Sequence, residues 1–382
     1  MPWLIAGVVV IGLAFVFGRK TDGSVRVPTD GAEVLEKVAS SSASGRELKG
    51  LELAARDDAQ SVAKATAAAR KAIELARAEA DPRYWGRAQA ALQPWWGVAD
   101  APPEVVLLRA TIRQALHDFD GARADLQRLG GDPQAVLTLA TVELVTGRYA
   151  EAKAACERLQ ADALVVAVCG AQADSLTGKA VEARAMLEAA LGSMPQHPQA
   201  AWALSVLGEV RERSGDDGAA EAAYREALKL DPNDGYTLTA LADLLLDLNR
   251  GAEVEPLLSS RFSDDNALLR LAVAEVRKNG KPGAYAQMLR WRYQASAERG
   301  DTVHQREQAR FQLEVERDAA KALELATKNW AVQKEPADAR VLLDAALAAG
   351  RPEAAREAAK HVLSSHMQEP RLLQRAKKVP AG

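Results

Sequence analysis

The sequence contains few of the residues from which catalytic and metal-binding sites are usually built. Two cysteines and five histidines occur among 382 residues. The cysteines do not form a Cys-x-x-Cys pair, which excludes a rubredoxin-like zinc module. His361 and His366 are five positions apart, so they do not share a helix face as a metal-binding pair would. Because a glycine-rich phosphate-binding loop is also missing, we expect no cofactor and no enzymatic activity.

Neither sign of charge is in excess, and no segment alternates β-branched residues as strands do. The chain has 49 basic and 52 acidic residues, well mixed along its length, for a net charge of −3. A nucleic-acid-binding protein would need a basic face, so we expect no nucleic-acid partner. The basic residues near the C-terminus, within residues 366–382, are predicted to form a solvated tail. The lack of alternation predicts essentially no β-sheet.

Residues 201–234 carry small and aromatic residues at a spacing that predicts two packed helices. Gly208 and Ala220 are small enough for the helices to approach closely, and Gly215 permits the turn between them. Tyr224 would fill the space that remains between the two helices. The window resembles one complete unit of the tetratricopeptide repeat (TPR) family, whose units are such helix pairs of about 34 residues.

The same unit recurs on both sides of this window with varying loop lengths. Small residues equivalent to Ala220 occur at Ala122, Ala152 and Ala183, so the steps are 30, 31 and 37 residues. We therefore predict an all-α fold. The resemblance implies a right-handed TPR solenoid of roughly eight or nine antiparallel helix pairs over residues 58–365. It also implies a concave face, formed by the first helix of each pair, on which ligands lie.

An uncharged apolar run, residues 3–18, lies near the start of the chain and is followed by Arg19-Lys20. As a helix it would extend about 24 Å, a little less than the ~30 Å hydrocarbon core of a membrane. We predict that residues 1–20 are a membrane signal-anchor, with a cleaved export signal as the alternative. Residues 21–57 are polar and predict a tether of low order.

Three further segments resemble a narrower group, the exported or membrane-anchored TPR proteins of proteobacteria. They are residues 81–96, residues 301–304 and residues 329–340. This resemblance implies a location at the cell envelope with the body of the protein in the periplasm. The basic residues after the apolar run instead favour a cytoplasmic body, because positive charges remain on the inner side of a membrane. We predict an inner-membrane anchor with a periplasmic body.

The two cysteines are predicted to lie side by side. Cys156 falls on the second helix of one unit and Cys169 on the first helix of the next, and such helices pack together in a TPR stack. A disulfide between them would require an oxidising compartment. Two buried free thiols are the alternative, because cysteine is a common small core residue.

The resemblance also implies where a partner would bind. Trp202 and Tyr236 would form an aromatic pair beside acidic and hydroxyl groups, which suits an extended peptide with apolar anchors. The alternative for Trp202 is that it packs across the insertion before its helix. The first-helix positions that would line the concave groove are Trp202, Ser205, Glu209, Arg213, Tyr236, Thr239 and Asp243.

Two functions remain open from the sequence. The first is a non-enzymatic scaffold for protein–protein interaction at the bacterial cell envelope, which holds a protein or peptide in the groove and meets the membrane through its N-terminal segment. The second is a holdase or biogenesis factor that binds unfolded exported polypeptides. Another candidate surface is the aromatic cluster of Tyr84, Trp85, Trp95 and Trp96, which we predict to be an N-terminal cap.

Overall fold

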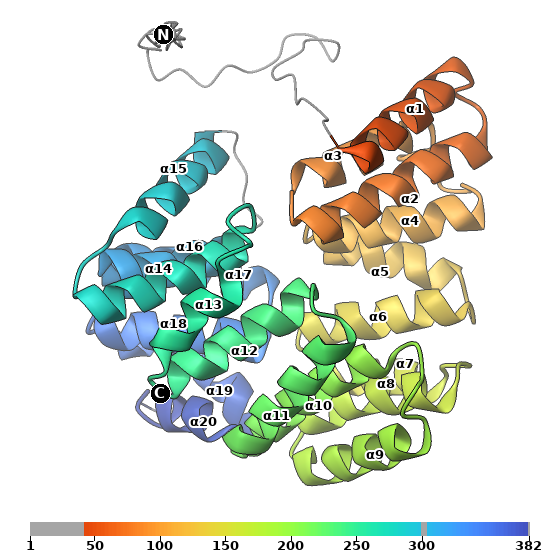
Figure 1. Ribbon diagram of the computed structural model, residues 1–382. Coiled ribbons are helices and arrows are strands. Elements are labelled where there is room, and N and C mark those ends of the chain that lie inside the picture. Colours follow the sequence, from red (N-terminus) through yellow and green to blue (C-terminus); the bar gives the residue numbers. More distant parts are fainter. Residues whose placement is uncertain (1–41, 299–303, 381–382) are drawn as a thin grey trace, which may run out of the picture. The chain divides into compact units, whose positions relative to one another are not determined.

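The structure is a computed structural model that describes residues 42–298 and 304–380, and every regular element in these ranges is a helix (Figure 1). This confirms the predicted all-α class. The earlier elements are α1 (Ala43–Asp57), α2 (Val62–Glu79), α3 (Arg83–Ala91), η1 (Gln93–Trp95), α4 (Pro103–Ala115), α5 (Phe119–Arg128), α6 (Pro133–Val145), α7 (Tyr149–Glu157), α8 (Ala163–Ser175), α9 (Ala180–Ser193), α10 (Ala200–Arg213) and α11 (Asp217–Leu230). The later elements are α12 (Gly235–Asp247), η2 (Gly251–Glu253), α13 (Val254–Leu258), α14 (Asp265–Asn279), α15 (Ala284–Glu298), α16 (Gln305–Phe311), η3 (Gln312–Glu316), α17 (Ala319–Val332), α18 (Pro336–Ala348), η4 (Pro352–Ala355), α19 (Arg356–Ser364) and α20 (Pro370–Ala376).

The predicted signal-anchor, residues 1–20, lies outside the described residues, as does most of the predicted tether, residues 21–57. None of the helices that the structure describes is both long and apolar enough to cross a membrane. The described end of the tether differs from the prediction, because it forms α1 and packs on α2. Leu48 is fully buried there, and Arg87 of α3 holds Glu52 at 2.7 Å. Most residues of this segment are polar or charged, so its single apolar face is difficult to recognise in the sequence.

Within the segment predicted as a solvated tail, residues 366–382, the described residues 366–380 also differ from the prediction. Leu372 is fully buried, and α20 packs on α18 and α19. Arg371 lies 2.6 Å from Asp217, and Arg375 is 2.6 Å from a carboxylate of α18. These basic side chains are ion-paired because carboxylates from distant parts of the sequence face them, which sequence spacing does not reveal.

Consecutive helices form the predicted pairs. Contacts join α4 with α5, α6 with α7, α8 with α9 and α10 with α11, and the series continues to α18 with α19. First helices pack side by side from α2 to α10 and again from α12 to α20, and α11 connects the two series. A Cβ on Gly208 would lie 2.4 Å from the ring of Tyr224, and Ala220 is fully buried on the facing helix. Small residues are thus required where α10 and α11 approach, as predicted.

Aspartates begin several helices, and glycines form the turns within the pairs. Asp132 and Asp162 accept hydrogen bonds from amides in the first turns of α6 and α8, at 2.9 and 3.0 Å. These amides would otherwise lack a partner. Gly147, Gly178 and Gly215 occupy successive turns with φ of +75°, +83° and +79°. A residue with a Cβ is strained in this region, so the local sequence fixes both the helix starts and the turns.

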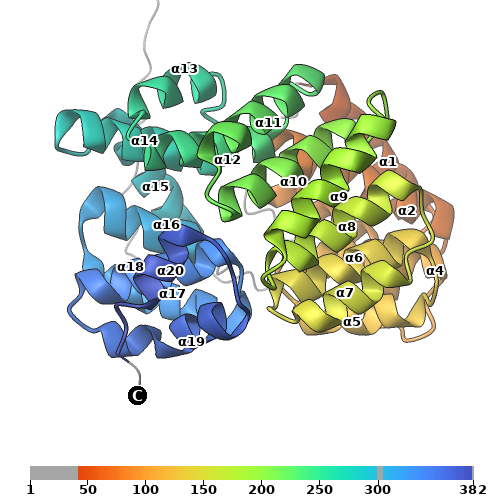
Figure 2. The same ribbon diagram turned by 90° about the horizontal axis from the view of Figure 1, so that it is seen from below.

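The C-terminal helices pack back against the turns of the middle pairs, which a solenoid with nearest-neighbour contacts alone would not require. The amide of Lys334 donates to the carbonyl of Val145 at 2.8 Å, and the amide of Ala180 donates to the side chain of Gln368 at 3.1 Å. In Figures 1 and 2 the blue C-terminal helices lie beside the green middle helices. We call this contact region the return interface, formed by Val145, Tyr149, Ala180 and Asp217 on one side and Lys334, His361, Gln368 and Arg371 on the other.

Two rings lie at the centre of the return interface. The buried hydroxyl of Tyr149 is 3.2 Å from the carbonyl oxygen of Lys334 and 3.0 Å from Nε2 of His361. Burial lowers the pKa of His361, and nearby Lys334 lowers it further, so the neutral ring is favoured. Both contacts are satisfied when Nε2 of His361 donates to Tyr149 and Tyr149 donates to the carbonyl. Tyr149 and Leu176 share one apolar core with α17–α20, so the interface belongs to the core.

Candidate functional site

The first helices of the later pairs surround a cavity of about 530 Å³, which we call the inner cavity. Its wall comes from α10, α12, α14, α16, α18 and α20, and charged side chains dominate it. Wall residues used below are Glu209, Arg213, Tyr236, Thr239, Asp243, Arg270, Arg306, Arg310 and Arg340.

The structure brings together most of the residues predicted to line a groove. Glu209, Arg213, Tyr236, Thr239 and Asp243 all line the inner cavity. Their role in binding a partner stays a prediction.

Two of the predicted groove residues do not line the inner cavity. Ser205 is 1% exposed and accepts a hydrogen bond from Thr237 at 2.8 Å, so its assignment to an accessible groove is wrong. The reason is that its position faces the start of α12, where the two hydroxyls satisfy each other. Trp202 packs against the apolar cluster of α8–α10 and is not among the residues that line the inner cavity.

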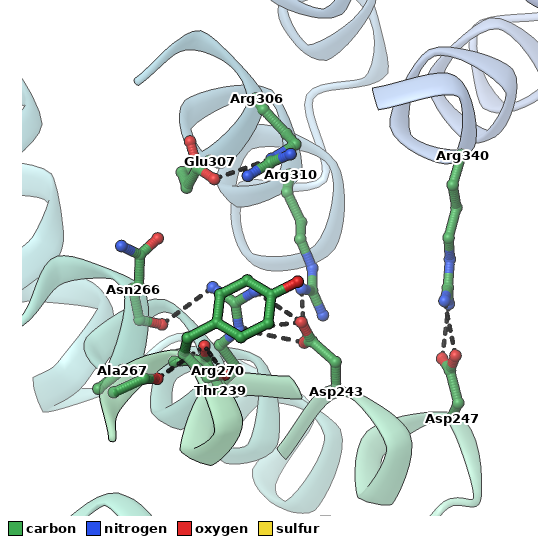
Figure 3. A network of polar contacts seen from close by, with 12 residues as sticks. Thr239, Asp243, Asp247, Asn266, Ala267, Arg270, Arg306, Glu307, Arg310 and Arg340 are labelled. Carbon is green, nitrogen blue, oxygen red and sulfur yellow. Dashed lines mark hydrogen bonds and ion pairs between the residues drawn. The ribbon is translucent and has the colours of Figure 1, made fainter. Parts of the chain in front are cut away.

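Asp243 is the centre of a charged network in the inner cavity. Arg270 of α14 and Arg310 of α16 each donate to its carboxylate at 2.6 Å (Figure 3). Burial alone would raise the pKa of Asp243, but the two guanidinium groups outweigh it and hold the pKa well below its usual range. One helical turn further along α12, Asp247 accepts two hydrogen bonds from Arg340 of α18, at 2.5 and 2.6 Å. Carboxylates of α12 thus join three later helices.

Tyr236 presents an aromatic ring at the wall of the inner cavity. It is 63% exposed, and its hydroxyl donates to Glu209. Glu209 also accepts from Arg213 at 2.8 Å, and Arg213 donates to Ser175 at 2.8 Å. The ring is therefore held in one position by a chain of polar contacts while its face remains accessible.

Two glutamates, Glu212 and Glu369, lie beside this network. Burial raises the pKa of Glu212 to about 8, and the neighbouring carboxylates of Glu369 and Asp247 add to the effect. Glu212 accepts a hydrogen bond from Tyr224 at 3.1 Å. Burial also raises the pKa of Glu369. The protonated form of Glu212 is therefore favoured at neutral pH, whereas the arginines around Asp243 favour its ionised form.

Sequence reasoning missed the arginines of α16 and α18. Arg306 and Arg310 are four positions apart, so they share one helix face, and that spacing could have indicated a charged inner wall. The segment 329–340 is explained by structure: Asp338 accepts from the amide of Glu335 and from the side chain of Asn329, both at 2.8 Å. It thereby fixes the start of α18 at the return interface.

The aromatic cluster lies in the apolar core of the first four helices. Tyr84 and Trp95 are buried, and Trp85 and Trp96 pack against the same core. The buried guanidinium of Arg109 donates to the carbonyl of Trp95 at 2.7 Å. These contacts agree with the predicted N-terminal cap.

Cys156 of α7 and Cys169 of α8 are joined by a disulfide, with their Cα atoms 5.5 Å apart. Both are buried, and they lie on consecutive helices as the sequence indicated. The structure therefore contains the bonded form of the two alternatives. Within residues 42–298 and 304–380, no group of three or more acidic, histidine or cysteine side chains is arranged to hold a metal ion.

Comparisons with known proteins identify the repeat. Residues 162–233 match the family model described as tetratricopeptide repeat. A chain in the crystal structure of the APC/C hetero-tetramer Cut9-Hcn1 is 12% identical, with 88% of this chain and 73% of that chain covered and a TM-score of 0.45. A chain in the structure of the human IFIT1 dimer with PPP-AAAA is also 12% identical, with 84% of this chain and 78% of that chain covered and a TM-score of 0.46. A tetratricopeptide repeat protein from Parabacteroides merdae is 12% identical, with 72% of this chain and 98% of that chain covered and a TM-score of 0.36. A comparison with curated proteins gave no match.

Proposed function

The chain carries tetratricopeptide repeats, and we propose that it is a non-catalytic scaffold that binds a protein partner at the inner cavity. Stacked helix pairs support this role because they form extended concave surfaces that suit the binding of other proteins. The observation that carries the proposal is the accessible ring of Tyr236 within a charged wall. Tyrosine is among the residues that most often dominate the binding energy of an interface.

The ion pairs around Tyr236 support the proposal in a second way. Arg270, Arg310 and Arg340 are already held by carboxylates of α12, so little side-chain freedom remains to be lost when a partner binds. Ordering of long side chains is one of the main costs of association. A wall that is ordered before binding therefore favours a defined partner with complementary polar groups.

Site-specific photocrosslinking tests the site. A photoreactive phenylalanine analogue at Tyr236 should crosslink to a partner in membranes prepared from the native host. The matched control is the same analogue at Leu230, which is 57% exposed at the end of α11 but does not line the inner cavity. A partner captured equally at both positions, or at Leu230 alone, would contradict the assignment.

The captured material distinguishes the scaffold from the alternative function. A scaffold should yield one dominant protein, and excess purified partner should abolish the crosslink. A holdase should yield many extended polypeptides, each bound weakly. Crosslinking to nucleic acid in place of protein would contradict the proposed class of partner.

The proposal includes an inner-membrane anchor at residues 1–20 and a body in the periplasm. The disulfide between Cys156 and Cys169 supports an oxidising compartment, because such bonds are rare where thiols are kept reduced. The resemblance to exported TPR proteins supports the same side of the membrane.

Reporter fusions at the C-terminus test the orientation. Alkaline phosphatase, which needs disulfides, should be active when fused there, and a reporter that works only in the cytoplasm should be inactive. The reverse pair of results would place the body in the cytoplasm. Carbonate extraction of membranes then separates an anchored protein from one released after cleavage.

A further inference from the structure

The second helix of one pair, α15, differs from other second helices in what it packs against. Each of α9, α11 and α17 packs both on the first helix of its own pair and on the first helix of the next pair. The main contact of α15 is with α14, toward which Leu289 is fully buried, and α15 lies at the edge of the described array (Figure 1). One side of α15 meets the next pair, where Arg290 lies 2.6 Å from Glu316 and the ring of Tyr293 packs edge-on against Phe311.

The side of α15 that faces away from these contacts carries a row of apolar residues. Ala284, Met288, Trp291 and Ala295 follow one another at steps of four, three and four positions. These steps place all four on one helix face, and the same steps form the seam through which two helices pack in a coiled coil. Trp291 is two positions from buried Leu289, so it points to the opposite side of the helix, and it is 63% exposed. We call these four residues the α15 seam.

Polar side chains limit the α15 seam on both sides. Gln287 and Gln294 flank it on one side, and Tyr285 and Arg292 flank it on the other. Arg292 is held by Asp265 at 2.6 Å. A helix that lies on a membrane surface has a broad apolar face opposite a basic one. The α15 seam is instead a narrow strip beside uncharged glutamines, which fits a second helix better than it fits lipid.

The α15 seam is complementary to itself when two copies lie antiparallel. The midpoint between residues 284 and 295 is also the midpoint between residues 288 and 291. A two-fold axis through this point therefore places Ala284 of each copy opposite Ala295 of the other, and Met288 opposite Trp291. The alanines allow the helices to approach, and a thioether beside an indole is a favourable contact.

The flanking residues agree with the same arrangement. It places Gln287 opposite Gln294, whose side-chain amides can donate to and accept from each other. On the other side it places Tyr285 opposite Arg292, whose guanidinium can pack over the ring. No two of these residues carry like charges that would face each other. A partner of unrelated sequence would need to supply the same pattern, whereas a second copy of the chain already has it.

We propose that α15 is a self-association surface, through which two copies of the chain pair antiparallel and bury Trp291 of each copy against the other. At 1.5 Å per residue α15 is about 22 Å long, so a contact along it is small and the dimer is weak and reversible. None of the four seam residues lines the inner cavity. The inference therefore goes beyond the proposed function and does not depend on the partner of that site.

Cysteine crosslinking tests the pairing and its direction. The two natural cysteines are bonded to each other, so an introduced cysteine supplies a free thiol of its own. Full-length Ala284→Cys and Ala295→Cys chains carry different epitope tags and are produced together or separately, then oxidised with copper phenanthroline. Produced together, the two variants should form a disulfide-linked dimer that carries both tags. Produced alone, each should crosslink poorly, because antiparallel pairing sets its two copies about 17 Å apart along the helix axis.

Sedimentation of the full chain over a range of concentrations measures the affinity. Trp291→Ala should weaken self-association by at least about tenfold, since a buried tryptophan commonly dominates a small interface. The control is Leu230→Ala, which removes another exposed apolar side chain, 57% exposed at the end of α11, and should leave the affinity unchanged. Both variants should keep the melting temperature of the wild type, because both side chains are exposed.

Several results would overturn the proposal. One is a chain that stays monomeric in sedimentation and forms no crosslinked dimer in the mixed sample. Another is an equal loss of affinity in Trp291→Ala and Leu230→Ala. Crosslinking of each variant alone as strongly as of the mixture would contradict the antiparallel direction. Coupling of Ala295→Cys to a different protein, or its labelling by a lipid-embedded thiol reagent, would assign the α15 seam to that protein or to the membrane instead.

Discussion

A single glycine in the α6–α7 turn serves two purposes. Gly147 has φ of +75°, and a Cβ there would lie 2.8 Å from Cε1 of His361 and 3.0 Å from Cβ of Lys334. The absence of a side chain thus permits both the turn and the approach of the C-terminal helices. Gly350 has a similar φ of +67° in a turn of the C-terminal part, but a Cβ added there would meet no described atom within 4 Å.

The comparison of these two glycines gives a prediction. Gly350→Ala should cost about 1–2 kcal/mol of unfolding free energy from backbone strain alone. Gly147→Ala should cost about 1–3 kcal/mol more, because the added methyl group pushes His361 and Lys334 away from the turn. Chemical denaturation measures both values. Equal losses of unfolding free energy in Gly147→Ala and Gly350→Ala would show that the return interface does not constrain the α6–α7 turn.

The acid–base behaviour of two carboxylates gives a second prediction at this scale. The pKa of Glu212 is raised to about 8 in the folded chain, so the folded state binds more protons than the unfolded state. Its contribution to stability is full below about pH 4.5 and is lost as the pH rises through about 8. Glu212→Gln keeps the acceptor for Tyr224 and should raise stability above pH 8 by at least about 1 kcal/mol, with little effect at pH 4.5.

Asp243 should behave in the opposite way, because Arg270 and Arg310 hold its pKa well below the usual range. Its contribution to the free energy of unfolding is present at neutral pH and is lost as the pH falls below about 4. Asp243→Asn should therefore destabilise by about 2 kcal/mol or more at pH 7, since it leaves two arginines without their carboxylate. Melting curves of Glu212→Gln between pH 4.5 and pH 9, and of Asp243→Asn between pH 2 and pH 7, test the pair. A destabilisation by Asp243→Asn that does not shrink as the pH falls below about 4 would refute the assignment.

At the scale of elements, the disulfide joins one helix pair to the next. Cys156 and Cys169 are separated by 13 residues, and closing a loop of this size stabilises a protein by about 3 kcal/mol. Reductant should lower the melting temperature of the wild-type chain. The Cys156→Ser, Cys169→Ser double variant should melt near the reduced wild type and should not respond to reductant. A wild-type chain whose melting does not change on complete reduction would contradict the prediction.

Across the whole described molecule, the return interface makes distant helices depend on each other. A chain ended after Ser365 lacks Gln368, Arg371 and α20. In a solenoid with nearest-neighbour coupling, faster hydrogen exchange would appear only in α18 and α19. We expect it also at the α8–α9 and α10–α11 turns, because these turns contact the removed residues. The α4–α5 turn is the internal reference, and changes confined to α18 and α19 would disprove the coupling.

The parts that the sequence could predict are those fixed by neighbouring residues. Gly208, Ala220 and Tyr224 indicated the helix pair because their spacing reflects a contact between consecutive helices. Part of the inner wall was also predicted, since first-helix positions recur with the repeat. The return interface could not be predicted, because Tyr149 and His361 are 212 positions apart and are of types that occur in many other settings. Ser205 was misassigned for a similar reason, as its hydroxyl partner lies on another helix pair.

The return interface has a mechanical consequence. An array of helix pairs that touch only their neighbours behaves like a coil spring, which lengthens smoothly because every joint yields a little. In this protein, Lys334 is tied to Val145 and Arg371 to Asp217, so an extending force first acts on those ties. The described array is therefore stiff at low tension and becomes compliant only after the ties rupture. The force at which the array yields is therefore set by these polar contacts together with the apolar core that Tyr149 and Leu176 share with α17–α20.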